Sequence, residues 1–234
     1  DWLFPRVCFG CEMPRTGAEP AQFGPGTWLC RACEDELPRI DSAVCAVCGE
    51  PYDGALSHAF RCWNCQDREF DFEFAVSGYR ARGLLRDLIH AFKYENRYET
   101  RGLLASLLRR ALQDPRLAGE DLADWLLVPV PLHPLREMAR GYNQCWEIAL
   151  ELSRATGIPA AQALRRTRRT HSQAGLGRAS RLRNLRGAFA LRPSQNVAGK
   201  CVLLIDDVLT TGSTCQEGAR ALRREGGAEK VVVI

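Results

Sequence analysis

A run of chemically capable residues follows a short apolar stretch near the end of the chain. The segment reads CVLLIDDVLTTGSTCQEG over 201–218, so two aspartates come directly after five residues typical of a buried strand. The small and hydroxyl residues at 210–214 precede a predicted helix, whose N-terminal N–H groups and dipole favour a phosphate. Carboxylates repel phosphate, but they accept hydrogen bonds from a vicinal diol or gather Mg²⁺. The spacing therefore predicts a site for a ribose 5-phosphate.

Other classes of protein also carry paired acids after a strand. A P-loop ATPase needs GxxxxGK[ST] upstream, whereas the one Gly-Lys pair, Gly199-Lys200, is followed by Cys201 and lacks the first glycine. A response-regulator domain carries its acids after the first strand, and here they follow the last predicted strand but one. Both classes are disfavoured. A capped helix with solvated aspartates stays open as the alternative without a ligand.

Eight of the eleven cysteines lie in the first 65 residues as four CxxC pairs. Two such pairs can complete a tetrahedral site with zinc–sulfur distances of about 2.3 Å, so we predict two structural zinc ions. We expect the first pair to join the second and the third to join the fourth, because this pairing closes the shorter loops. Disulfides, a redox CxxC and an iron–sulfur cluster fit the context or the spacing less well. The predicted ligands are Cys8, Cys11, Cys30, Cys33, Cys45, Cys48, Cys62 and Cys65.

The remaining chain is predicted to form an α/β domain with a mainly parallel sheet flanked by helices. The composition changes after the last CxxC pair, so we place a zinc-binding module at 1–68 and the α/β domain at 69–234. Short apolar segments typical of strands are 70–79, 125–131, 161–164, 187–191, 201–205 and 230–234. Segments with helical spacing are 84–92, 103–112 and 145–152.

Ligands of parallel sheets bind beyond the carboxyl ends of the strands. The exits after Val130, Arg166 and Ile205 are polar, and we expect the site there. Lys93 is one of three lysines beside 29 arginines. It lies between two predicted core-facing helices, and its rarity is a hint of a selected role, but we interpret it as a surface lysine.

The formal charge of +4 conceals an asymmetry along the chain. Between Glu151 and Asp206 there are eleven basic residues and no acidic one. We expect this stretch to attract polyanions, and 154–192 is a candidate contact for single-stranded DNA. Its one aromatic residue is Phe189, so base stacking by this stretch is not expected. A solvated surface in an arginine-biased chain is the alternative.

The sequence shows no apolar run of eighteen residues, and its first residues, DWLFPRVCFGC, lack the order of a signal peptide. We therefore expect a cytoplasmic protein without membrane insertion.

Several segments together resemble known families. VLLIDDVLTTGST is similar to the 5-phosphoribosyl-1-pyrophosphate (PRPP) motif of type I phosphoribosyltransferases. VPVPLHPLREMARGYNQ, RTRRTHSQAGLGRASRLRNLRGAFAL and the CxxC pairs resemble the ComF/ComFC family, which includes GntX-like proteins. The resemblance covers nearly the whole chain and implies a type I phosphoribosyltransferase-like fold. Members are associated with natural transformation and DNA utilisation, which implies competence-machinery proteins as candidate partners.

The resemblance also implies roles for particular residues. Arg136 and Arg140 would approach the pyrophosphate of PRPP, with Mg²⁺ bridging. Residues 170–184 correspond to a lid, in which Arg178 would make a mobile pyrophosphate contact and His171 and Gln173 are weaker candidates. Arg140 and Arg178 are the candidate catalytic residues. The ribose and 5′-phosphate would bind Asp206, Asp207, Thr210, Thr211, Gly212, Ser213 and Thr214.

The chain departs from the superfamily pattern at Thr210. Salvage enzymes of 6-oxopurines usually carry aspartate there, and a threonine cannot act as that general base at neutral pH. The acceptor is therefore not implied. Two functions stay open: a phosphoribosyltransferase with an unknown acceptor, and a non-catalytic single-stranded-DNA-binding protein that retains the PRPP fold.

Overall fold

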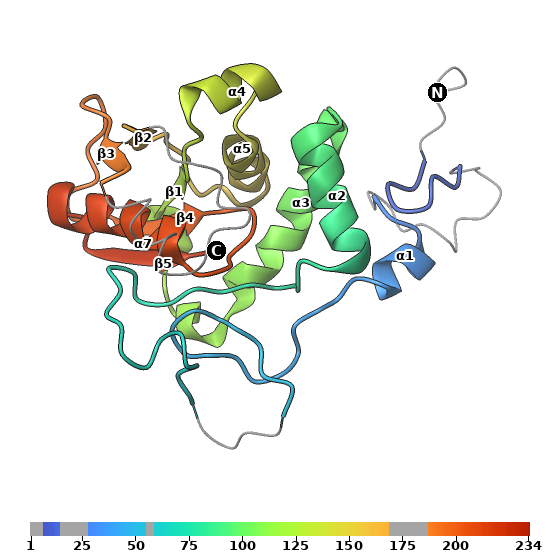
Figure 1. Ribbon diagram of the computed structural model, residues 1–234, viewed down its shortest axis with the longest axis horizontal. Coiled ribbons are helices and arrows are strands. Elements are labelled where there is room, and N and C mark those ends of the chain that lie inside the picture. Colours follow the sequence, from blue (N-terminus) through green and yellow to red (C-terminus); the bar gives the residue numbers. More distant parts are fainter. Residues whose placement is uncertain (1–6, 15–27, 55–58, 169–186) are drawn as a thin grey trace.

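The computed structural model describes residues 7–14, 28–54, 59–168 and 187–234 (Figure 1). The strands are β1 (Leu126–Pro129), β2 (Leu164–Arg166), β3 (Phe189–Leu191), β4 (Cys201–Ile205) and β5 (Lys230–Val233). The α-helices are α1 (Arg31–Asp35), α2 (Gly83–Tyr94), α3 (Arg101–Leu108), α4 (Pro134–Arg140), α5 (Gln144–Thr156) and α7 (Ser213–Arg220). Short turns of other helical types are η1 (Tyr98–Thr100), η2 (Arg109–Gln113), η3 (Pro115–Leu117), η4 (Leu122–Asp124) and η5 (Ala221–Glu225).

A parallel sheet of order β1-β4-β5 forms the centre of the α/β part. Two extended segments widen it, because 159–161 hydrogen-bonds along β1 and 73–76 hydrogen-bonds along β5. The strands are continuous apolar runs, as expected for a sheet that is covered on both faces. The predicted parallel sheet is confirmed.

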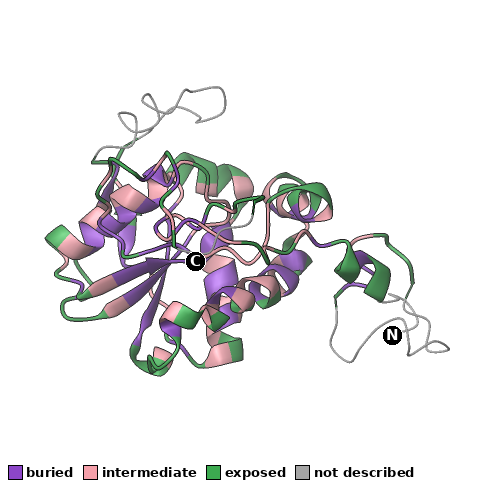
Figure 2. Cartoon of the chain, turned by 90° about the horizontal axis from the view of Figure 1, so that it is seen from below, coloured by how far each residue is buried: buried purple, intermediate pink, exposed green. Residues whose placement is uncertain are grey.

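Strand side chains alternate between two cores. Leu127 and Leu203 contribute to the core formed with α2, α3 and α5. Val128 and Leu204 contribute to the opposite core, formed with α7, β2 and β3. Figure 2 shows the buried residues concentrated in the sheet and on the helix faces turned toward it. Both faces of the sheet are therefore occupied, and its carboxyl edge is left for a site.

The strands β2 and β3 depart from the expected pattern. They form a separate antiparallel pair, with Leu164 opposite Leu191. Beyond this pair, Thr167 Oγ1 donates to the Gly187 carbonyl at 3.0 Å, which holds the two chain ends together. The chain therefore runs beside β1 at 159–161 and then turns into a local pair instead of adding a long parallel strand.

The N-terminal part contains two knuckles of the same design. Each is closed by a short antiparallel bridge, Val7 to Pro14 in the first and Val44 to Pro51 in the second. In each, the residue after the second cysteine has a positive φ, 60° for Glu12 and 70° for Gly49. The second knuckle also bonds to the sheet, because the Ala75 N–H donates to the Val47 carbonyl at 2.7 Å. None of the helices in the described ranges has the length and apolar character that crossing a membrane requires.

Candidate ligand site and metal centres

β4 ends in two aspartates, of which the first is turned toward buried donors. Asp206 Oδ1 accepts from the Asp207 N–H at 3.0 Å and from the Cys145 thiol at 3.9 Å. Its Oδ2 accepts from the Cys215 thiol at 3.5 Å. Burial and then the neighbouring Asp207 charge raise the pKa of Asp206 to about 7. Asp206 therefore exchanges a proton near neutral pH.

The second aspartate is held by two donors on a single oxygen. Lys93 Nζ lies 2.7 Å from Asp207 Oδ2, and Gln144 Nε2 donates to the same atom at 2.8 Å. Burial opposes the charge on Lys93, but the Asp207 carboxylate outweighs it and raises the pKa of the ammonium. The side chain of Lys93 is 18% exposed, so the expectation of a surface lysine is wrong. The reason is that the end of α2 points at the carboxyl edge of the sheet.

The segment between α4 and α5 sets the position of Gln144. Asn143 caps α5 by accepting from the Cys145 N–H at 3.0 Å, and its Nδ2 donates to the Val130 carbonyl at 3.1 Å. Arg140 Nη1 donates to Gln144 Oε1 at 2.5 Å. The predicted catalytic Arg140 is therefore joined to Asp207 through a single amide side chain, at the exit of β1.

The loop after the aspartates forms the start of α7. Gly212 is its N-cap residue with φ +69°, a left-handed conformation that glycine adopts without steric cost. Thr211 Oγ1 and Ser213 Oγ lie 2.8 Å apart, and Arg68 Nη1 donates to the Thr211 carbonyl at 3.3 Å. No N-cap side chain occupies this helix start. Its backbone N–H groups therefore suit an anion, beside the exposed Thr210.

Basic residues surround the acidic pair on the β2 side. Burial and then the nearby Arg136 charge lower the pKa of Arg166, and Asp206 opposes that shift. Arg136 itself is exposed on α4. A cavity of about 70 Å³ between the exits of β1 and β2 is lined by arginines that include Arg165 and Arg192. This side of the site can attract a second anionic group.

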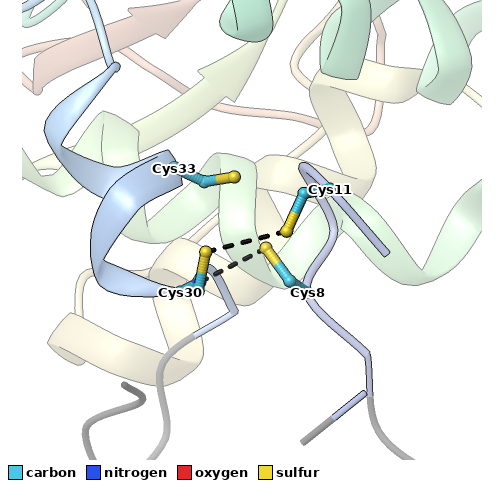
Figure 3. A group of neighbouring side chains, drawn as sticks. All are labelled: Cys8, Cys11, Cys30 and Cys33. Carbon is cyan, nitrogen blue, oxygen red and sulfur yellow. Dashed lines mark hydrogen bonds between the residues drawn. The ribbon is translucent and has the colours of Figure 1, made fainter. Parts of the chain in front are cut away.

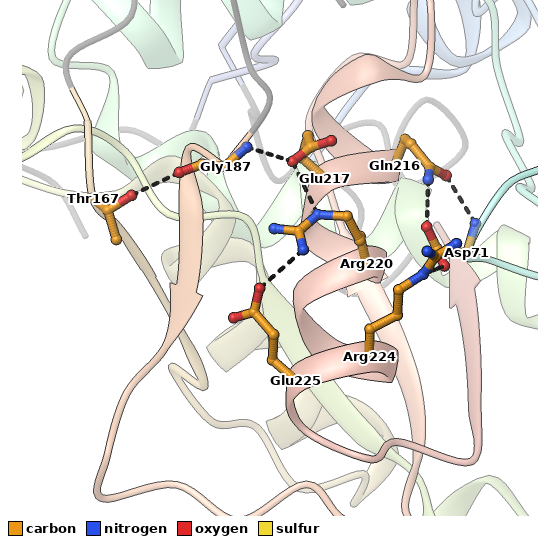
Figure 4. Close-up of polar contacts among 8 residues, drawn as sticks. All are labelled: Asp71, Thr167, Gly187, Gln216, Glu217, Arg220, Arg224 and Glu225. Atoms are coloured by element: carbon orange, nitrogen blue, oxygen red, sulfur yellow. Dashed lines mark hydrogen bonds and ion pairs between the residues drawn. The ribbon is translucent and has the colours of Figure 1, made fainter.

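The predicted lid residues Arg178, His171 and Gln173 lie outside the described residues. Where that stretch rejoins the described chain, the Gly187 N–H donates to Glu217 Oε2 at 2.8 Å (Figure 4). Glu217 also accepts from Arg220 Nε at 3.2 Å. The chain after the predicted lid is thus fastened to α7, the helix that begins at the predicted phosphate loop.

A second set of polar contacts fastens α7 to the segment that follows the zinc-binding part. Asp71 accepts from Gln216 Nε2 at 2.5 Å and from Arg224 Nε at 2.6 Å, and the Asp71 N–H donates to Gln216 Oε1 at 2.8 Å (Figure 4). Asp71 is 9% exposed. The Gln216 amide thus donates to the Asp71 carboxylate and accepts from the Asp71 backbone N–H, which fixes the register between this segment and α7.

The eight cysteines form two groups of four in the predicted sequential order. Within each group, the sulfur atoms all lie within 4.8 Å of one another. Figure 3 shows Cys8, Cys11, Cys30 and Cys33 converging from a knuckle and from the start of α1. The second group is Cys45, Cys48, Cys62 and Cys65.

Backbone donors add to the case for a cation in these groups. The N–H groups of Gly10 and Cys30 each donate to Cys8 Sγ at 3.3 Å, and Cys62 N–H donates to Cys45 Sγ at 3.3 Å. Burial opposes ionisation of Cys8, but the backbone N–H groups of Cys11, Cys30 and Gly10 lower its pKa to about 7. Four converging sulfurs with N–H donors suit a tetrahedral zinc thiolate site, without a position left for water.

Comparison with known proteins gives matches along nearly the whole chain. Residues 1–66 match the family model described as a double zinc ribbon domain. Competence protein F of Haemophilus influenzae is 33% identical over 203 residues, which cover 86% of each chain. DNA utilization protein YhgH of Escherichia coli K12 is 34% identical over 227 residues, 96% of this chain and 93% of that protein. Competence protein ComFC of Bacillus subtilis is 25% identical over 88% of this chain and 82% of that protein.

The chain belongs to the ComF/ComFC family. Among solved structures, the glutamine PRPP amidotransferase of B. subtilis in complex with ADP and GMP is similar, with a TM-score of 0.37 and 23% identity. That similarity covers 57% of this chain and 25% of the other. The predicted fold class, α/β with a mainly parallel sheet and a small N-terminal zinc-binding module, is confirmed for this ComF/ComFC chain.

Sequence reasoning missed several residues of the ComF/ComFC site. Cys145 was expected on the buried stripe of its helix, and it lies there, but its thiol also reaches Asp206. Gln144 is the last residue of the RGYNQ segment. That segment indicated that this region belongs to the site, but it did not indicate that the Gln144 amide contacts Asp207. Cys215 follows the hydroxyl residues and gave no signal of its contact with Asp206.

Proposed function

We propose that this ComF/ComFC chain binds PRPP at the carboxyl end of β4 and acts in the uptake or use of DNA. The observation that carries the ligand is the adjacency of the Asp206–Asp207 pair to a helix start capped only by Gly212. Diol acceptors and a phosphate cradle next to each other match the ribose and the 5′-phosphate. The acidic pair accepts from the ribose hydroxyls, and residues 210–214 hold the 5′-phosphate.

The pyrophosphate of PRPP lies, in this proposal, on the basic side of the acidic pair. Three arginines lie on this side, Arg136 and Arg140 in α4 and Arg166 in β2. Their positive charge offsets the negative charge of the leaving pyrophosphate. Mg²⁺ is a hard cation that prefers carboxylate and phosphate oxygens, and Asp207 Oδ1 has no hydrogen-bond partner within the described ranges. The donor set therefore fits, and Asp206 and Asp207 would hold the metal together with PRPP.

The chain is a candidate phosphoribosyltransferase with an unknown acceptor. In that reaction, a nucleophile bonds to C1 of the sugar while the C1–O bond to pyrophosphate breaks and the bonding electrons leave with pyrophosphate. Arg140, and Arg178 from outside the described residues, are the groups proposed to stabilise the departing charge. Thr210 gives no general base at the usual position, so the donor is better supported than the acceptor.

Isothermal titration with PRPP and Mg²⁺ tests the ligand. Asp207→Ala should weaken PRPP binding by roughly 10- to 100-fold, as expected for hydrogen bonds to a charged group. Glu120→Ala is the matched control, because Glu120 also pairs with a lysine at 2.7 Å but lies away from the site. Wild-type protein that fails to bind PRPP, or equal affinities for Asp207→Ala and the control, would contradict the proposal.

The role in DNA uptake or use rests on the names of the relatives, Competence protein F and DNA utilization protein. The second candidate function is binding of single-stranded DNA without catalysis, favoured by the eleven basic residues of the acid-free stretch. Within the described ranges these residues are spread over the fold, since Lys200 directly precedes β4 while Arg166 ends β2 of the separate antiparallel pair. Competence-machinery proteins are proposed partners, and the cytoplasm is the proposed location.

The DNA-binding candidate is tested by measuring affinity for an oligothymidylate at several salt concentrations. Phosphate contacts predict that the logarithm of the binding constant falls linearly with the logarithm of salt, by about 0.7 for each contact. A flat response, or no binding at low salt, counts against this function and leaves the PRPP proposal standing.

A further inference from the structure

A lysine from outside the PRPP motif lies against the acidic pair. Lys93 is in the last turn of α2, and its side chain and that of Asp207 are 18% and 11% exposed. The neighbouring Phe92 is buried, and the Tyr142 hydroxyl donates to its carbonyl. The rings of Phe92 and Tyr142 also contact each other, with centroids 5.2 Å apart. The end of α2 is therefore fixed to the segment that leads into Gln144.

This attachment makes two donors converge on one atom. Tyr142 ties α2 to the chain two residues before Gln144, so Lys93 and Gln144 reach Asp207 Oδ2 from two different elements. The other oxygen, Oδ1, has no partner within the described ranges. One side of the carboxylate is thus anchored while the other is presented to a ligand.

We propose that Lys93 is a positioning residue of the PRPP site, which holds Asp207 Oδ2 together with Gln144 so that Oδ1 faces the ribose and its metal. The inference rests on the proposed PRPP binding. Lys93 also supplies the positive charge that offsets two adjacent carboxyl groups where a polyanion must approach.

The type of cation supports positioning over a merely structural ion pair. Lysine is a point charge that can approach one carboxylate oxygen, whereas the arginine fork tends to bind both oxygens at once. In a chain with 29 arginines and three lysines, the residue on Asp207 is a lysine. Buried ion pairs are also weak sources of stability, because desolvation offsets the attraction. A lysine therefore suits a contact to Oδ2 that leaves Oδ1 for a ligand.

Isothermal titration of zinc-loaded full-length protein with PRPP and Mg²⁺ tests the inference. Lys93→Met keeps the length of the side chain and should weaken PRPP binding by about 10- to 100-fold, as for other outer partners of ligand-binding carboxylates. Lys93→Arg should recover part of the affinity, because it restores the charge but competes for Oδ1.

Lys230→Met is the matched control, since Lys230 pairs with Glu120 at the same 2.7 Å distance, remote from the site. It should bind PRPP like the wild type. If Lys93→Met binds like this control, the positioning role is overturned while PRPP binding stands. Fewer binding sites per chain at an unchanged dissociation constant would indicate a smaller folded fraction and would also overturn it. Absence of binding by the wild type would overturn both proposals.

Discussion

Asp206 carries an electrostatic cost that should be visible as a pH-dependent difference in stability. Its pKa is raised from 3.8 to about 7, first by burial and then by Asp207. The unfolded chain ionises this group above about pH 4, so the folded state loses stability as pH rises from there to about 7. This rise of the Asp206 pKa corresponds to a loss of about 4 kcal/mol of unfolding free energy over that pH range.

The perturbation is Asp206→Asn, which keeps the shape and the acceptor for the Asp207 N–H but cannot ionise. Between about pH 5.5 and pH 8.5 the free energy of unfolding of the wild type should fall by about 2 kcal/mol relative to that of the variant. For a protein of this size that difference corresponds to about 4–8 °C in melting temperature. The variant should therefore gain in melting temperature, relative to the wild type, as the pH is raised.

Differential scanning calorimetry of zinc-loaded protein without PRPP measures this difference. Asp67→Asn is the control, because Asp67 is exposed and has no polar partner within the described ranges. Its offset from the wild type should stay constant with pH. An Asp206→Asn offset that is equally constant would refute the account of a carboxyl group buried beside a second acid.

Further predictions concern the zinc sites, the contacts of α7 and its first turn. Cys45→Ser should lower the zinc content from about two ions per chain to one by elemental mass spectrometry, since a complete set of thiolates is needed at each site; retention of both ions would contradict the grouping. Asp71→Ala should lower the free energy of unfolding by about 1–3 kcal/mol in urea, because Gln216 and Arg224 lose their acceptor. An unchanged urea midpoint would argue against that contact. Gly212→Ala should cost about 1–2 kcal/mol through its φ of +69° and should weaken PRPP binding, whereas wild-type stability would mean that the turn adjusts.

The features that follow from local pattern were predictable from the sequence. The apolar run 201–205 forms β4, and the segment 145–152 with helical spacing lies within α5. The four CxxC pairs also grouped as expected. Each of these depends on residues that are close in the sequence, where turn chemistry and hydrophobic period carry the information.

The contacts that shape the site depend on residues that are far apart in the sequence. Gln144 and Asp207 are 63 residues apart, and no local pattern indicates that they meet. Lys93 follows an apolar helical stripe, and on that pattern we predicted a solvated side chain. The prediction failed because hydrophobic periodicity does not show what lies next to the end of a helix in the folded protein. The antiparallel β2–β3 pair was missed for a related reason, since short segments such as 161–164 and 187–191 do not specify their partner strand.

The backbone bond from Ala75 to Val47 has a consequence for treating the two predicted domains as separable units. One side of the segment 73–76 hydrogen-bonds to β5, and on the other side the Ala75 N–H donates to the second zinc ribbon. A chain cut near residue 68 would leave that outer side as an open sheet edge, which is a template for pairing between molecules. It would also lose Arg68, whose side chain binds the carbonyl of Thr211 in the phosphate loop. The ribbon thus protects the sheet from self-association, and a fragment without it should aggregate before its ligand binding can be judged.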